Sequence, residues 1–206
     1  YNIEFKTLIR PKLNITLNKP DKKILKETNL INENVLIIGG SSGIGNDLLK
    51  LFLNNKKIKI ISTYYKNKIN ENRKNLIIKN VNVETDLKVI YKIIKKFEPI
   101  IIYYFPTPKI FSNLINDKNL IELYKKYFIH IPIKIIKYAS NFQSKFFYPS
   151  TTYTNTLSPY SLIKLKAENE ISKLRKLKTK VNILRIPGVN TKQNLSLMSG
   201  QLPNFR

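Results

Sequence analysis

Apolar and polar positions alternate along the chain with two different periods, which predict strands and helices in regular succession. Six short apolar runs have the form of buried strands: 34–39, 58–63, 75–83, 99–105, 145–150 and 181–186. Four longer segments carry apolar residues at helical spacing and predict helices: 43–55, 86–97, 120–142 and 158–177. Strands that alternate with helices predict a doubly wound α/β fold, with a parallel sheet and helices on both faces.

Prolines and polar residues refine the two longest helical segments. Pro132 lies inside the segment 120–142 and should interrupt it. Ser158 and Pro159 open the last helix, with Ser as its N-cap and Pro at the first helical position.

The first 32 residues differ from the rest and predict a separate part of the chain. Residues 1–32 alternate in the manner of two short strands, broken by Pro11 and Pro20, and continue into a polar linker. We expect an extended arm, a linker or the tail of an upstream domain, followed by one domain over 33–206. The chain begins with Tyr and ends soon after the last predicted strand. We therefore expect a fragment or processed product whose domain lacks its C-terminal part.

Composition limits the possible chemistry. The 206 residues contain no Cys and one His, which excludes disulfides and thiolate catalysis and argues against a metal site. The net charge is +24, but lysine is spread along the whole chain, which favours compositional drift over a dedicated nucleic-acid site. No apolar run is long enough for a membrane span, and the first residues do not form a signal peptide. We expect a cytoplasmic protein.

Four of the six glycines fall within residues 39–45, between the first strand and the first helix. A strand, a glycine-rich turn and a helix form a dinucleotide-binding arrangement, because the helix N-terminus presents free N–H groups to phosphates. Gly39 would allow the tight turn, Gly43 the approach of the pyrophosphate and Gly45 close packing of the helix. The predicted phosphate-binding residues are Gly39, Ser41, Ser42, Gly43, Ile44 and Gly45.

The residues after the second strand bear on the choice of cofactor. A carboxylate there would bind the ribose hydroxyls of NAD and repel a 2′-phosphate. The sequence has no acid at this point, but it has Tyr64, Lys66 and Lys68. This pattern predicts a preference for NADP(H) over NAD(H).

Tyr160 and Lys164 lie four residues apart in the last predicted helix and therefore share one of its faces. A lysine ammonium beside a phenol stabilises the phenolate and should lower the pKa of Tyr160. Such a tyrosine can exchange a proton with a carbinol or a carbonyl near neutral pH.

The motif GGSSGIG at 39–45 and the Tyr160/Lys164 pair resemble those of the short-chain dehydrogenase/reductases, a Rossmann-fold family, over about residues 33–195. The resemblance implies that Tyr160 is the general acid/base and that Lys164 also holds the nicotinamide ribose. It implies that Ser150, or alternatively Thr151, orients the substrate carbonyl. It further places His130 at the position of a proton-relay residue.

The resemblance also implies further cofactor contacts. Asn82 and Val83 fall where the family binds the adenine. Pro187 and Gly188 would turn the chain so that the backbone of Val189 meets the nicotinamide carboxamide.

The family's compact and extended subgroups both remain open, since the phrase at 148–168 matches each in part. The predicted function is NADP(H)-dependent hydride transfer between nicotinamide and a carbonyl or alcohol substrate, in a homo-oligomer. The alternatives are a nucleotide-sugar epimerase, dehydratase or reductase of the extended subgroup, or a binding module with impaired catalysis. The last is suggested by Phe105 and Pro106, which stand where the family has small residues. A polyanion-binding protein is suggested by the net charge alone.

Overall fold

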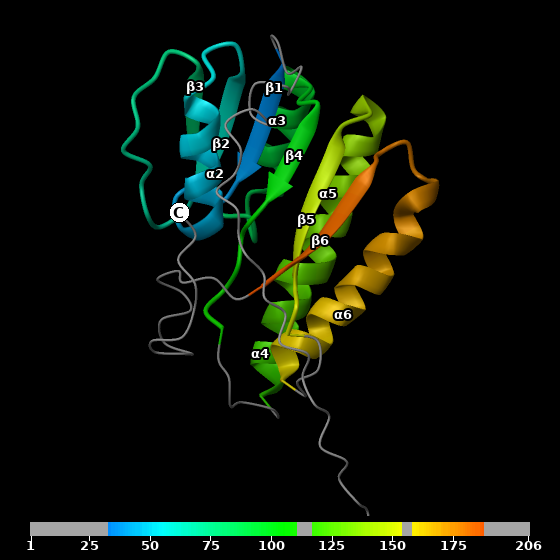
Figure 1. The fold of residues 1–206 in the computed structure, drawn as a ribbon. Helices are drawn as coiled ribbons and strands as arrows, with labels where there is room; N and C mark the ends of the chain where they lie inside the picture. The colour runs from blue at the N-terminus through cyan, green and yellow to red at the C-terminus, as the bar shows by residue number, and fades with distance from the viewer. Residues whose placement is uncertain (1–32, 111–116, 154–157, 188–206) are drawn as a thin grey trace, which may run out of the picture. The chain divides into compact units, whose positions relative to one another are not determined.

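A six-stranded parallel sheet organises residues 33–110, 117–153 and 158–187, which are the residues that the computed structural model describes (Figure 1). The strand order is β3-β2-β1-β4-β5-β6. The strands are β1 (Asn34–Ile38), β2 (Lys59–Tyr64), β3 (Leu76–Asn80), β4 (Ile101–Tyr104), β5 (Lys145–Thr151) and β6 (Val181–Ile186). The order reverses between β1 and β4, so the carboxyl ends of these two strands flank a crevice. The predicted doubly wound sheet is confirmed.

Helices cover both faces of the sheet. They are α2 (Gly43–Leu53), α3 (Leu87–Phe97), α4 (Lys118–Lys125), α5 (Ile131–Ala139) and α6 (Pro159–Ser172), with short 3₁₀ turns at Ser140–Phe142 and Lys173–Lys176. The helices α3, α4, α5 and α6 share one large apolar cluster with alternate strand residues. The helix α2 lies on the other face, where Phe52 contacts Tyr103 of β4.

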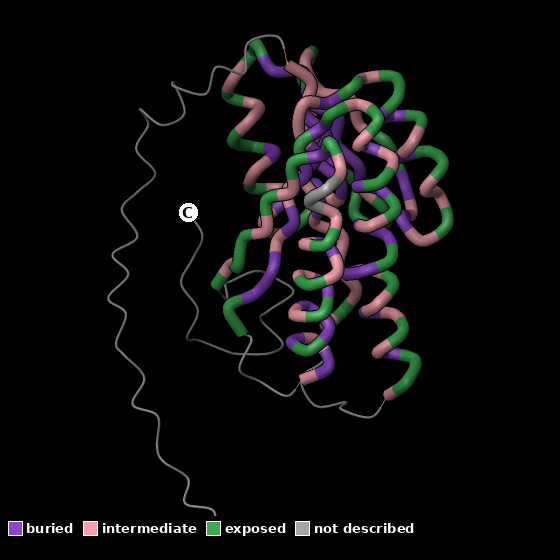
Figure 2. Tube along the Cα trace, turned by 90° about the vertical axis from the view of Figure 1, so that its right-hand side faces the viewer, coloured by how far each residue is buried: buried purple, intermediate pink, exposed green. Residues whose placement is uncertain are grey.

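Strand residues are buried on both faces of the sheet, and the larger apolar cluster lies on the face toward α3–α6. Figure 2 shows this burial along the central strands. Leu36, Ile102 and Phe146 are fully buried at the centre. Tyr104 and Tyr148 are equally buried, yet their hydroxyls donate to the carbonyls of Tyr127 and Phe128, at 2.8 and 3.0 Å. The buried phenols are therefore hydrogen-bonded, as burial of a polar group requires.

The expected interruption before Pro132 takes the form of a π-helical turn, Lys126–His130, between α4 and α5. The N–H of Ile131 donates to the carbonyl of Lys126, five residues earlier. Pro132 falls in the first turn of α5 and has no N–H to donate, and the Phe128 carbonyl four residues earlier accepts from the Tyr148 hydroxyl instead. The helical stretch therefore continues across the proline with a local change in pitch.

The start of α6 is as predicted. Ser158 is the N-cap, its hydroxyl accepts from the N–H of Ser161 at 3.3 Å, and Pro159 follows at the first position. Among the described residues, no helix combines the length and apolar character that a bilayer crossing requires.

Candidate functional site

The turn after β1 is tight because two of its glycines adopt left-handed backbone conformations. Gly39 has φ of 81° and Gly43 has φ of 52°. The N–H groups of Gly39 and Gly40 donate to the hydroxyl and carbonyl of Thr63 in β2, at 3.1 and 2.9 Å. The turn is thus fixed to the neighbouring strand, and residues with a side chain would be strained at Gly39 and Gly43.

Gly45 lies where α2 passes closest to this turn. A Cβ atom at Gly45 would lie 2.3 Å from the Gly39 carbonyl oxygen and 3.1 Å from the ring of Phe105. Ser42 is the N-cap of α2, but its side chain makes no capping hydrogen bond. The first N–H groups of α2 therefore have no side-chain cap at the edge of the cavity described below.

Replacing Gly45 by Ala should weaken the binding of a dinucleotide at this turn and lower the melting temperature. Alanine is the better helix former by about 1 kcal/mol, so on an open helix surface this substitution would stabilise the protein. Here the clash with a backbone carbonyl outweighs that gain, because the turn itself must move. Fluorescence titration and thermal unfolding measure the two effects, with exposed Lys50→Ala as the control on the same helix. A Gly45→Ala protein with normal binding would contradict the close packing described here.

A cavity of about 850 Å³ runs from the glycine turn to the start of α6. Its lining at one end includes the predicted phosphate-binding residues Gly39, Ser41, Ser42, Gly43, Ile44 and Gly45. Thr151, Tyr160 and Lys164 line it at the other end. A close-fitting glycine turn, an uncapped helix start and a cavity of this size suit a bound dinucleotide.

The ends of β2 and β3 form one wall of this cavity. Tyr64, the last residue of β2, and the nearby Lys66 line it, and Asn82 and Val83 line it after β3. The amide oxygen of Asn82 accepts from the N–H of Glu84 at 3.0 Å, so it supports its own loop.

Glu84 clamps the loop after β3 to the π-helical turn. Its carboxylate accepts from the Tyr127 hydroxyl at 2.6 Å and from the Lys126 ammonium at 2.8 Å. Hydrogen bonds from Lys126 and Tyr127 lower the pKa of Glu84. This clamp joins two walls of the cavity, and the sequence patterns did not predict it.

Tyr160 contacts Thr151 at the end of β5. Burial raises the pKa of the Tyr160 phenol to about 12, although its hydrogen bond with the Thr151 hydroxyl lowers it. The ring lies edge-on to Tyr124 and Phe128, with centroids 6.2 and 5.6 Å away. The expected lowering of the Tyr160 pKa is therefore wrong, and burial is the reason.

Lys164 is buried, with 5% of its surface exposed. Its ammonium donates to the Pro149 carbonyl at 2.6 Å and to the Tyr148 hydroxyl at 3.4 Å. It also lies 4.4 Å from the centre of the Phe128 ring. Burial lowers the pKa of Lys164 to about 7, against the charge of Glu168, which raises it. The hydrogen bonds of the Lys164 ammonium therefore lead to β5 rather than to Tyr160.

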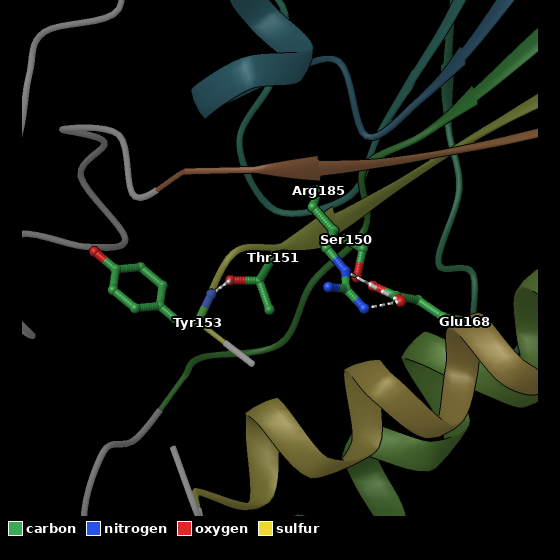
Figure 3. A network of polar contacts seen from close by, with 5 residues as sticks. All are labelled: Ser150, Thr151, Tyr153, Glu168 and Arg185. Carbon is green, nitrogen blue, oxygen red and sulfur yellow. Dashed lines mark hydrogen bonds and ion pairs between the residues drawn. The ribbon is translucent and has the colours of Figure 1, made fainter. Parts of the chain in front are cut away.

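Ser150 and Thr151 have different partners, as Figure 3 shows. The Ser150 hydroxyl donates to the carboxylate of Glu168, which also binds Arg185 of β6. The Thr151 hydroxyl accepts from the N–H of Tyr153 at 3.1 Å and bonds to Tyr160. Of the two candidates for orienting a carbonyl, the structure brings Thr151 to Tyr160 and holds Ser150 on Glu168.

His130 lies outside this arrangement. It ends the π-helical turn, is exposed and does not line the cavity. Its neighbours Tyr127 and Phe128 do line the cavity. The π turn, which no sequence pattern indicated, thus directs these two residues rather than His130 toward the site.

Phe105 and Pro106 lie directly against the glycine turn. A Cβ atom at Gly39 would approach the Pro106 nitrogen to 3.1 Å, and the N–H of Phe105 donates to the Ile38 carbonyl at 2.9 Å. Both residues line the cavity without closing it. Pro187 also lines it, whereas Gly188 and Val189 lie outside the described residues.

Several residues of the site were missed from the sequence, and some of them had a usable signal. Glu168 is four residues after Lys164, and helical spacing places both on one face. Tyr148 precedes Ser150 by two residues, so strand alternation places both on one face of the sheet. The Pro149 carbonyl had no such signal, because backbone partners depend on how α6 packs on β5.

Comparisons with known proteins place this geometry in a recognised fold. No protein-family model and no curated protein sequence matches the chain. A short-chain dehydrogenase family protein from Francisella tularensis is similar in structure, with 21% identity, a TM-score of 0.67, and coverage of 80% of this chain and 73% of that one. A short-chain dehydrogenase from Burkholderia cenocepacia, solved with NADP, is also similar in structure, with 9% identity and a TM-score of 0.71. The match covers 84% of this chain and 80% of that one.

A UDP-glucose 4-epimerase from Thermotoga maritima, solved with UDP-glucose, is also similar, with 17% identity and a TM-score of 0.61. The match covers 74% of this chain and 54% of the epimerase, so the chain spans about half the length of that enzyme. At these identities the likeness concerns the fold. The chain has the Rossmann-type fold of the short-chain dehydrogenase/reductases, as the resemblance predicted.

Proposed function

We propose that this chain is the nucleotide-binding part of an NADP(H)-dependent oxidoreductase of the short-chain dehydrogenase/reductase type, acting on a carbonyl or alcohol substrate. One observation carries the proposal. A single cavity joins the uncapped start of α2, beside the glycine turn, to Tyr160 and Lys164. A dinucleotide is the ligand whose phosphates suit the first feature and whose reactive end suits the second.

In this proposal the chain's residues hold the cofactor and move one proton. The turn 39–45 and the start of α2 bind the pyrophosphate, and Lys164 holds the nicotinamide ribose. The nicotinamide, when bound, supplies or accepts a hydride. Tyr160 donates the proton to the carbonyl oxygen during reduction, and it removes that proton in the reverse direction. Burial raises the pKa of this phenol to about 12, which further favours its protonated form.

Thr151 is the better candidate to orient the substrate carbonyl. Its hydroxyl bonds to Tyr160, so an oxygen that accepts from Tyr160 would lie within reach of Thr151 as well. The hydroxyl of Ser150 is engaged by a carboxylate. We therefore assign Ser150 to the support of the site and Thr151 to substrate contact.

NADPH should bind more tightly than NADH, and Lys66→Glu should remove the difference. Lys66 lines the cavity after β2, and a charge-assisted hydrogen bond to the 2′-phosphate stabilises binding by about 1.5–3 kcal/mol. We expect Lys66→Glu to weaken NADPH binding about 10–100-fold and to leave NADH binding nearly unchanged. Fluorescence titrations of the purified chain with both cofactors measure this.

Lys68→Glu is the matched control, because Lys68 is exposed and does not line the cavity. Both variants lower the net charge by the same amount. If the positive charge of the chain attracted NADPH only in a general way, the two variants would weaken NADPH binding equally. Equal effects, or no binding of either cofactor to the unmodified chain, would refute the proposed specificity.

A further inference from the structure

The carboxylate of Glu168 is the centre of a network behind the end of β5 (Figure 3). Arg185 of β6 donates to it through Nε, at 3.0 and 3.2 Å, and through Nη2, at 2.8 Å. Ser150 of β5 donates its hydroxyl to the same group. The Glu168 side chain is only 16% exposed, whereas that of Arg185 is 49% exposed. The network thus links α6, β5 and β6 at one point.

This point adjoins the residues that hold Lys164. Ser150 directly follows Pro149, whose carbonyl accepts from the Lys164 ammonium at 2.6 Å. It directly precedes Thr151, which bonds to Tyr160. Anchoring Ser150 therefore fixes both of its backbone neighbours: Pro149, which contacts Lys164, and Thr151, which contacts Tyr160.

Glu168 also bears on the charge of Lys164, since it is one helical turn further along α6. Its carboxylate favours the ammonium form of Lys164. Burial raises the pKa of Glu168, but hydrogen bonds from Arg185 and Ser150 lower it, with a smaller lowering by Lys164. Arg185 partly neutralises this carboxylate from the solvent side. The titratable groups around Lys164 and its neighbours come from four elements: Tyr160 and Glu168 of α6, Tyr148 of β5, Arg185 of β6 and Tyr124 of α4.

We propose that Glu168 is a positioning residue that, with Arg185 and Ser150, fixes the end of β5 against Lys164 and places a negative charge one helical turn from it. The catalytic meaning of this role rests on the proposed function. The Glu168 carboxylate lies one helical turn from Lys164, and Arg185 of β6 is bound to this same carboxylate.

Two substitutions should shift the titration of Lys164 in opposite directions. Glu168→Gln removes the negative charge and should lower the pKa of Lys164, by about one unit. Arg185→Gln leaves the Glu168 carboxylate less neutralised and should raise the pKa of Lys164. Competitive acetylation of the cofactor-free protein at a series of pH values, with the Lys164 peptide quantified by mass spectrometry, measures both. A purely structural role would give shifts of the same sign or none, and either result would overturn the proposal.

Two further variants complete the test. Glu170→Gln removes a carboxylate of the same helix that pairs with Lys173, and it should leave the pKa of Lys164 unchanged. Arg185→Lys keeps the positive charge, so the pKa of Lys164 in this variant should stay close to that in the unmodified protein. It also controls for misfolding of Arg185→Gln. A Glu170→Gln shift as large as that of Glu168→Gln would overturn the proposal.

Turnover provides a separate readout. The alkaline limb of kcat/KM against pH should move to lower pH in Glu168→Gln and to higher pH in Arg185→Gln. Acetylation needs no cofactor or substrate, so failure of the proposed oxidoreductase function would appear as absent NADPH binding and absent turnover. Failure of the inference would appear in the acetylation of Lys164.

Discussion

Replacing Tyr160 by Phe should lower turnover about 10²–10⁴-fold, the usual contribution of a positioned general acid or base. The phenylalanine ring keeps the edge-on contacts with Tyr124 and Phe128, so the fold and cofactor binding should be preserved. The substitution removes only the hydroxyl that bonds to Thr151. Steady-state kinetics with a panel of carbonyl substrates, together with NADPH titration, measure the two quantities separately.

Tyr138→Phe is a suitable control for this experiment. This substitution also removes a tyrosine hydroxyl, but Tyr138 of α5 stacks on Tyr91 of α3 and does not line the cavity. Its turnover should remain near that of the unmodified protein. If Tyr160→Phe retained full activity in the same assay, Tyr160 would not be the proton donor.

Replacing Lys164 by Met should weaken NADPH binding about tenfold or more, yet stabilise the cofactor-free protein near pH 7 by roughly 2 kcal/mol. A fully buried lysine whose pKa falls from 10.5 to about 7 costs roughly 3–5 kcal/mol near neutral pH, at about 1.4 kcal/mol per pKa unit. Methionine removes this cost, but it leaves the Pro149 carbonyl without its lysine donor, which costs about 1–3 kcal/mol. Urea unfolding and NADPH titration measure the two effects.

The stability gain should depend on pH in a defined direction. Between pH 7 and about 10.5 the unfolded chain binds one more proton at Lys164 than the folded chain, so the stability of the unmodified protein rises with pH in this window. The advantage of Lys164→Met should therefore shrink as pH rises toward 10. Lys166→Met removes an exposed lysine of the same helix and should show no such trend. Parallel pH dependence of Lys164→Met and the unmodified protein would contradict the lowered pKa of Lys164.

The sequence was sufficient for the architecture because local patterns determine it. Apolar runs marked all six strands, and the glycines of 39–45 marked the crossover from β1 to α2. Ser158 and Pro159 fixed the start of α6 to the residue. These features depend on backbone conformation and burial over a few residues, which the sequence displays directly.

The chemistry of the site was less accessible from the sequence, because it depends on contacts between distant segments. The spacing of Tyr160 and Lys164 suggested a lysine that acts on the phenol, but burial of Lys164 and the carbonyl of Pro149 direct its ammonium to β5. The choice between Ser150 and Thr151 likewise depends on partners in α6 and β6. Desolvation arises from the whole fold, so no local pattern predicts its effect on pKa values.

The π-helical turn Lys126–His130 ties the length of the chain to the geometry of the site. A π turn holds one residue more than an α-helical turn, and each residue of an α-helix rotates the next by about 100°. Deleting one residue here would replace the π turn by a regular α-helical turn, so the residues inside the turn would lose their present positions. The carbonyls of Tyr127 and Phe128 would then leave the hydroxyls of Tyr104 and Tyr148, and the Phe128 ring would leave Lys164. This segment should therefore tolerate substitutions on its exposed side far better than any insertion or deletion during evolution.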